Sequence, residues 1–135
     1  EKGVAYENNP NLDIREYIHD MPDCLAAADL VIARAGAITL AELTAVGRAS
    51  VLIPSPNVAE NHQYHNAMVL ANHKAAVVIE EKDLTGEKLV AAVKEMTADP
   101  EKLREISLAA KALGVPNACG HITDELLDLY KTHRK

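Results

Sequence analysis

The segment between residues 30 and 42 combines the features of a phosphate-binding turn. A continuous apolar run, Leu30–Ala33, is followed by Arg34, three small residues and then Thr39. Small side chains let a ligand approach the backbone, and the free N–H groups at a helix start attract phosphate. Thr39 can add a hydroxyl donor, and Glu42, one helical turn further on, can accept hydrogen bonds from two ribose hydroxyls. The alternatives are a turn that is small for packing alone and a surface charge at Glu42.

A second polar cluster occupies residues 60–66, where seven consecutive side chains can form hydrogen bonds. Amides offer both a donor and an acceptor, so amides and imidazoles that face a cleft can recognise sugar hydroxyls. His62 and His65, near Glu60, also fit a general base or a metal site, but the HExxH spacing is absent and no third ligand is evident. A solvated helix start is the remaining alternative for this segment.

The charge and composition of the chain exclude several classes of function. Its 135 residues include 14 basic and 20 acidic side chains, no Trp, no Phe and 4 Tyr, for a formal net charge of −6. Nucleic acid is therefore not an expected partner, because it binds basic stripes and stacking aromatic rings. Cys24 and Cys119 lie far apart without CxxC spacing, which indicates reduced thiols. The length and the 48% of hydrophobic residues suit a single domain over residues 1–135.

Apolar runs alternate with helical periodicity, which predicts an α/β fold with a Rossmann-like parallel sheet flanked by helices. Four strands are expected, at Asp13–Ile18, Leu30–Ala33, Ser50–Ile53 and Ala75–Ile79. Helices are expected over residues 21–28, 38–46, 61–73, 85–98, 100–113 and 118–130. Open parallel sheets bind ligands at the carboxyl ends of their strands. We therefore expect a site where the loops Ile18–Asp20, Arg34–Ala37 and Ser55–Asn61 meet.

Together, these segments resemble the C-terminal domain of the MurG family, the bacterial UDP-N-acetylglucosamine:lipid I transferases of peptidoglycan synthesis. The segments that carry the resemblance are Ala28–Leu43, Gly47, Ile53–Asn57 and Asn61–Ala67. The family has a two-domain GT-B fold, in which the C-terminal half binds the donor UDP-GlcNAc and the N-terminal half binds the lipid-linked acceptor. The resemblance implies the C-terminal half of such a fold, truncated at its N-terminus, which fits a chain that opens at Glu1 without Met.

The resemblance assigns the nucleotide part of the donor to particular residues. It implies that the backbone of Ile18 contacts uracil, that Met21 packs near the nucleoside and that Glu42 holds the ribose hydroxyls. It also implies that the diphosphate faces the helix start formed by Ala37, Ile38 and Thr39.

The sugar part of the donor is assigned in the same way. The resemblance implies that His62 and Gln63 read the GlcNAc hydroxyls, although the family usually has Gln at the position of His62. Arg34 and Asn66 lie in the same motifs and are expected to bind substrate as well.

The resemblance also implies what lies outside this chain. The candidate general base and the acceptor domain that binds lipid I would precede it, so no catalytic residue is assigned and the fragment alone is expected to be inactive. No cofactor or metal is expected, because helix dipoles can stabilise the leaving UDP. The full-length protein is expected to be cytoplasmic and peripheral on the inner face of the plasma membrane, acting in cell-wall synthesis, cell shape and division.

Two alternative functions use the same residues. One is a non-catalytic nucleotide-sugar-binding subunit that works with a separate acceptor chain, and the other is a GT-B transferase for a different UDP-sugar. For either function, a sheet that lacks its first strand exposes an edge through which two copies could form a dimer.

Overall fold

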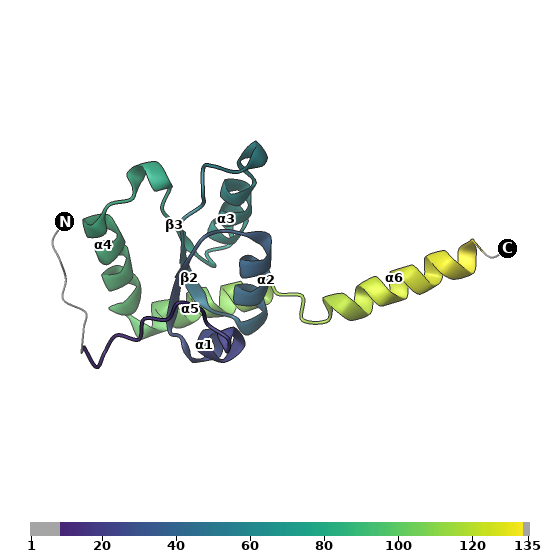
Figure 1. The fold of residues 1–135 in the computed structure, drawn as a ribbon, viewed down its shortest axis with the longest axis horizontal. Coiled ribbons are helices and arrows are strands. Elements are labelled where there is room, and N and C mark those ends of the chain that lie inside the picture. Colours follow the sequence, from purple (N-terminus) through teal and green to yellow (C-terminus); the bar gives the residue numbers. More distant parts are fainter. Residues whose placement is uncertain (1–8, 134–135) are drawn as a thin grey trace.

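A computed structural model describes residues 9–133 and contains a three-stranded parallel sheet at its centre (Figure 1). The strands follow the order β1, β2, β3, with bounds Leu30–Ala33, Ala49–Leu52 and Val77–Val78. Leu30 lies opposite Ala49 in the first pair, and Val51 lies opposite Val77 in the second. The central strand, β2, is buried along its whole length, as expected for a strand covered on both faces.

Helices cover both faces of this sheet, and a last helix, α6, follows them. Their bounds are α1 Met21–Ala27, α2 Ala37–Val46, α3 His62–Asn72, α4 Gly86–Thr97, α5 Pro100–Ala112 and α6 Ala118–Thr132, with short 3₁₀ turns at Ala59–Asn61 and Glu81–Asp83. In Figure 1, α1, α2 and α3 lie on one side of the sheet and α4 lies on the other. The predicted class, an α/β domain with a parallel sheet flanked by helices, is confirmed.

Two aliphatic cores hold these layers together. Leu43 and Leu52 are fully buried in the core under α1, α2 and α3, and Val51 and Met96 are buried in the core under α4. The α5 helix contributes to both cores, through residues 103–106 on one side and 109–113 on the other. It therefore ties the two faces of the sheet together.

Local sequence signals fix three of the helix ends. Gly47 ends α2 in the left-handed conformation at φ 70°, which glycine adopts without steric cost. The Thr85 hydroxyl accepts a hydrogen bond from the Lys88 N–H at the start of α4. The Asp99 carboxylate does the same for the N–H of Glu101 at the start of α5.

The predicted strand at Asp13–Ile18 is wrong, because this segment is an irregular loop. Two of its apolar side chains remain in solvent: Ile14 is 70% exposed and Tyr17 is 71% exposed. Its charged side chains pair locally instead, with Arg15 bound to Asp13. The described sheet therefore has three strands rather than four, and β3 is shorter than the predicted Ala75–Ile79.

The α6 helix projects away from the sheet and its covering helices (Figure 1). It has no buried residue, and its apolar side chains Ile122 and Leu126 are 60% and 61% exposed. The described cores therefore close at Leu113, before α6 begins. Within residues 9–133, no helix combines the length and the apolar character that a membrane crossing requires.

The end of α5 approaches α2 so closely that Gly114 leaves no room for a side chain. A Cβ at position 114 would lie 2.6 Å from the carbonyl oxygen of Thr44, whereas a Cβ at Gly86 would meet nothing within 4 Å. We predict that Gly114→Ala lowers the free energy of unfolding by about 1–3 kcal/mol, measured by urea denaturation, because the backbones must move apart.

The matched control is Gly86→Ala at the open start of α4, which should leave stability unchanged or raise it slightly by restricting the unfolded chain. Equal urea midpoints for the two variants would show that α5 does not pack against α2 at this distance.

Candidate functional site

A cavity of about 460 Å³ lies between α1, β1 and the first turns of α2. Four of the residues predicted to bind the nucleotide line it, namely Ile18, Met21, Thr39 and Glu42. They come from three separate parts of the chain, so the fold brings together residues that the sequence keeps apart. The volume lies within the range of small-molecule sites.

The loop before α1 contributes Ile18 to this cavity. Among residues 9–20, Ile18 alone is half-buried, and it lines the cavity. Its backbone N–H and C=O form no hydrogen bond with any described residue. Both groups can therefore bind the polar edge of a planar ring.

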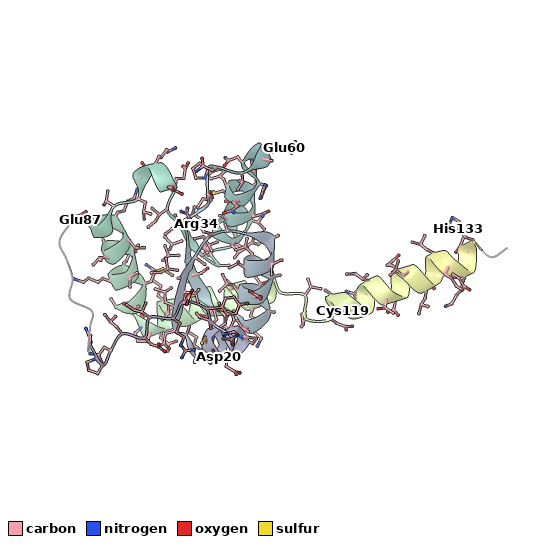
Figure 2. The ribbon with its side chains drawn as sticks, viewed as in Figure 1. Asp20, Arg34, Glu60, Glu87, Cys119 and His133 are labelled. Atoms are coloured by element: carbon pink, nitrogen blue, oxygen red, sulfur yellow. The ribbon has the colours of Figure 1, made fainter. Side chains whose placement is uncertain are left out.

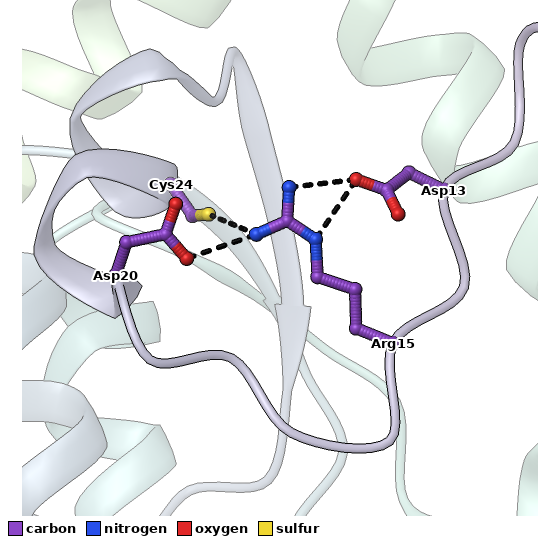
Figure 3. A network of polar contacts seen from close by, with 4 residues as sticks. All are labelled: Asp13, Arg15, Asp20 and Cys24. Atoms are coloured by element: carbon purple, nitrogen blue, oxygen red, sulfur yellow. Dashed lines mark hydrogen bonds and ion pairs between the residues drawn. The ribbon is translucent and has the colours of Figure 1, made fainter.

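Arg15 holds this loop in place (Figure 3). Its Nε donates to Asp13 Oδ2 at 2.9 Å, and its Nη1 donates to Asp20 Oδ1 at 2.9 Å. The same Nη1 lies 3.9 Å from Cys24 Sγ. The hydrogen bond from Arg15, and then its charge, lower the pKa of Asp13 below its usual value, so this pair is ionised at neutral pH.

The first turn of α2 leaves backbone donors free. Gly36 precedes the helix without a side-chain cap, and the first helical hydrogen bond runs from the Leu40 N–H to the Gly36 carbonyl. The N–H groups of Ala37, Ile38 and Thr39 therefore have no partner among the described residues. They form an anion-attracting helix end next to the cavity.

The structure explains the small side chains of residues 35–37 in different ways. Ala35 is completely buried in the core, so packing explains it. Ala37 is exposed, and a Cβ built on Gly36 would meet only Thr39 Oγ1, at 3.8 Å. Because Gly36 also has an ordinary backbone conformation, at φ −68° and ψ 146°, neither packing nor geometry requires glycine there. The open space above Gly36 is thus available to a ligand.

Glu42 lies one turn beyond Thr39 on the same side of α2. Its side chain is exposed and forms no hydrogen bond or ion pair with any described residue. A carboxylate at the rim of a cavity, free of protein partners, can accept two hydrogen bonds from a diol.

Arg34 lies at the carboxyl end of the sheet rather than in this cavity (Figure 2). Its guanidinium donates to the Ile53 carbonyl at 3.3 Å and forms an ion pair with Glu81. These partners follow β2 and β3, while Arg34 itself follows β1. Arg34 thus links the ends of all three strands, and sequence reasoning had not anticipated Glu81 as its partner.

The predicted sugar-binding residues lie at the start of α3, outside the cavity. Gln63 Oε1 accepts a hydrogen bond from the Ser55 N–H at 3.0 Å, which leaves the amide N–H₂ free among the described residues. His62 Nδ1 lies 2.8 Å from the carbonyl oxygen of Ala59. Asn66 Nδ2 donates to the Ala35 carbonyl at 3.5 Å, which joins α3 to the turn before α2.

Sequence reasoning missed the apolar wall of the cavity. Cys24, Leu25 and Ala28 supply it from α1 and the residue that follows this helix. Cys24 lies three residues beyond Met21, so helical spacing alone would have placed both side chains on one face.

A second cavity, of about 470 Å³, lies at the opposite end of the sheet. Residues 71–77, which precede and begin β3, line it together with part of α5. None of the predicted site residues borders this cavity. Among the described residues, no cluster of three or more His, Cys, Asp or Glu side chains could hold a metal ion.

The parallel sheet, the helices on both faces and the cavity beside the carboxyl end of β1 define a Rossmann-like α/β domain. The chain belongs to the family described as glycosyltransferase family 28 C-terminal domain, whose model matches residues 1–122. The predicted resemblance is thereby confirmed.

Relatives of known name agree with this family. A Desulforamulus reducens protein, UDP-N-acetylglucosamine--N-acetylmuramyl-(pentapeptide) pyrophosphoryl-undecaprenol N-acetylglucosamine transferase, is 48% identical over 122 residues, which cover 90% of this chain and 33% of that protein. The Bacillus subtilis protein of the same name is 46% identical over 130 residues, covering 96% of this chain and 35% of that protein. This chain therefore spans about a third of the length of these relatives.

A solved structure shares the fold. The crystal structure of Acinetobacter baumannii MurG matches with a TM-score of 0.77 at 33% sequence identity, covering 83% of this chain and 32% of that one. The sheet and its helices thus have the arrangement found in the corresponding third of that protein.

Proposed function

We propose that this chain binds UDP-N-acetylglucosamine as the donor-binding part of an inverting N-acetylglucosaminyltransferase. The observation that carries the proposal is the cavity in which Ile18, Met21, Thr39 and Glu42 meet, in a chain of this family. The acceptor would be the N-acetylmuramyl-(pentapeptide) pyrophosphoryl-undecaprenol that the names of the relatives specify.

We place the nucleotide with its uracil at the α1 end of the cavity and its diphosphate at the start of α2. Uracil lies against Ile18, whose free backbone N–H and C=O match the adjacent acceptor and donor on the edge of the ring. The ribose then reaches Glu42, whose carboxylate has no protein partner among the described residues. The diphosphate meets the free N–H groups at Ala37 and Thr39.

This placement gives the α2 helix a role in the chemistry. When the bond between the sugar and the diphosphate breaks, negative charge develops on the leaving UDP. The N–H groups and the dipole of α2 already point at this charge, so they stabilise it without reorganisation. Our expectation that no metal or cofactor is needed rests on this contribution.

The sugar would lie between the start of α2 and the start of α3. Gln63 is held by the Ser55 N–H through its carbonyl oxygen, which fixes the direction of its free N–H₂ group. That group donates to a GlcNAc hydroxyl, with His62 beside it and Asn66 supporting the turn. Arg34, at the end of the sheet, would hold the strand ends around the donor.

The remainder of the reaction needs residues beyond this chain. We place the general base and the acceptor site in the part of the longer relatives that this chain does not match, so the chain alone should bind donor without transferring sugar. Such an enzyme would work peripherally at the inner face of the plasma membrane, in cell-wall synthesis, cell shape and division. In the isolated chain, the outer edge of β1, unpaired among the described residues, would allow two copies to pair.

One prediction from this placement concerns Glu42. Replacing it in Glu42→Ala should weaken UDP binding to this chain by about 1–3 kcal/mol, roughly 5- to 150-fold in Kd, because charge-assisted hydrogen bonds to the ribose are lost. Isothermal titration calorimetry with UDP measures the effect. Glu87→Ala, which removes an exposed carboxylate at the start of α4, is the control and should keep the wild-type Kd. A Kd for Glu42→Ala within twofold of wild type would remove Glu42 from the site.

Another prediction concerns donor choice by Gln63. In Gln63→Glu the side chain can still accept the Ser55 N–H but has no N–H₂ group to donate to the sugar. We expect a lower kcat/KM for UDP-GlcNAc. We also expect a smaller ratio of kcat/KM for UDP-GlcNAc to kcat/KM for its 4-epimer, UDP-GalNAc, because the hydroxyl that distinguishes the two donors loses its partner.

The kinetics would use a chimera in which this chain replaces the matching residues of the Bacillus subtilis relative. Gln63→Ala, which also releases the Ser55 N–H, separates loss of the sugar contact from loosening of the loop. If Gln63→Glu keeps the wild-type preference ratio, Gln63 does not read the sugar.

A further inference from the structure

The loop that carries Ile18 has little packing of its own. Residues 9–17, 19 and 20 are all exposed, and the segment forms neither helix nor strand. Fixing such a loop costs conformational entropy that few buried contacts offset. Something else must therefore keep Ile18 against the cavity.

Arg15 is the side chain that closes the loop. Its guanidinium contacts a carboxylate on each side of Ile18, with Nη2 at 2.7 Å from Asp13 Oδ2 and Nη1 at 2.9 Å from Asp20 Oδ1. Figure 3 shows the guanidinium between the two carboxylates, with the Cys24 sulfur on the α1 side. The loop from residue 13 to residue 20 is thus cross-linked through one cation.

The Asp20 carboxylate binds Arg15 rather than the start of α1. We call the contacts of Arg15 with Asp13 and Asp20 the Arg15 bridge. Asp20 precedes α1 at its N-terminal end, where an Asp side chain usually caps the helix, yet it makes no such bond here. It binds Arg15 instead, immediately before Met21, which lines the cavity. The bridge therefore connects the loop directly to the cavity wall.

We propose that Arg15 is a positioning residue, which holds the Ile18 loop closed against α1 and so preorganises the nucleoside part of the cavity without touching the ligand. The consequence for UDP rests on the proposed function. Without the bridge, the closed loop is only a fraction of the population, and the observed Kd rises in proportion to that loss.

Arg15 should matter more for binding than for overall stability. Arg15 and its two partners are between 40% and 68% exposed, and exposed ion pairs contribute little to folding. The loop also lies outside both aliphatic cores. We therefore expect Arg15→Ala to unfold at nearly the wild-type temperature.

The test uses Cys24 as a reporter of the closed loop. The sequence has two cysteines, so Cys119→Ser on α6 leaves Cys24 as the sole thiol. In this background we compare Arg15→Ala and Arg15→Lys with Lys102→Ala, which removes an exposed 2.9 Å ion pair to Glu95 away from the nucleoside cavity. The two measurements are the rate of Cys24 alkylation by iodoacetamide without ligand and the Kd for UDP.

For Arg15→Ala we expect several-fold faster alkylation and about a three- to tenfold higher Kd for UDP. Loss of a nearby cation would by itself make the thiol less reactive, so a faster rate reports exposure of Cys24. Arg15→Lys, which keeps the charge but cannot bridge both carboxylates in the same way, should fall between wild type and Arg15→Ala. Lys102→Ala should match wild type in both measurements.

An unchanged alkylation rate in Arg15→Ala overturns the inference. A higher Kd with an unchanged rate also overturns it, because Arg15 would then act on the ligand directly. If the wild-type chain does not bind UDP, the proposed function fails, but the alkylation rate still decides whether Arg15 holds the loop.

Discussion

Parallel pairing of β2 with both of its neighbours is the constraint on which the rest of the structure depends. Because all three strands run the same way, their carboxyl ends meet at one edge, where Arg34 joins them through the Ile53 carbonyl and Glu81. The buried side chains of β2 require helices on both faces, and those helices carry the polar residues of the site. The cavity therefore lies where it does because α1 and α2, which cover one face of the sheet, also form its walls beside β1.

Strong apolar runs and turn signals made much of this fold predictable from the sequence. The apolar runs at Leu30–Ala33 and near residues 49–53 predicted β1 and β2, although only β2 is buried along its whole length. Gly47 ends α2 shortly before β2 begins. The segment Asp13–Ile18 was misread because a weak alternation does not reveal whether a neighbouring surface exists to bury Ile14 and Tyr17. That information lies in tertiary contacts, which local periodicity does not contain.

The sequence named residues that the fold groups at two places, the cavity beside α1 and the start of α3, but it did not show this division. The sequence and its family resemblance indicated Ile18, Thr39 and Glu42, and the fold brings them into one cavity. His62, Gln63 and Asn66 lie outside that cavity, and each makes a contact within hydrogen-bond distance of another residue of the chain. Sequence spacing could not show that Gln63 uses its carbonyl oxygen to hold the Ser55 loop, since that bond depends on how the loop after β2 folds back.

We propose that a uridine nucleotide occupies the cavity between α1, β1 and α2. The most direct measurement is a titration of the ¹⁵N-labelled chain with UDP, followed by amide NMR signals. We expect concentration-dependent shifts at Ile18 and along the first turn of α2, from Ala37 to Thr39, with little change along residues 71–77 of the second cavity. Signals at Ile18 and Ala37 that do not move, or shifts concentrated at residues 71–77, would contradict it.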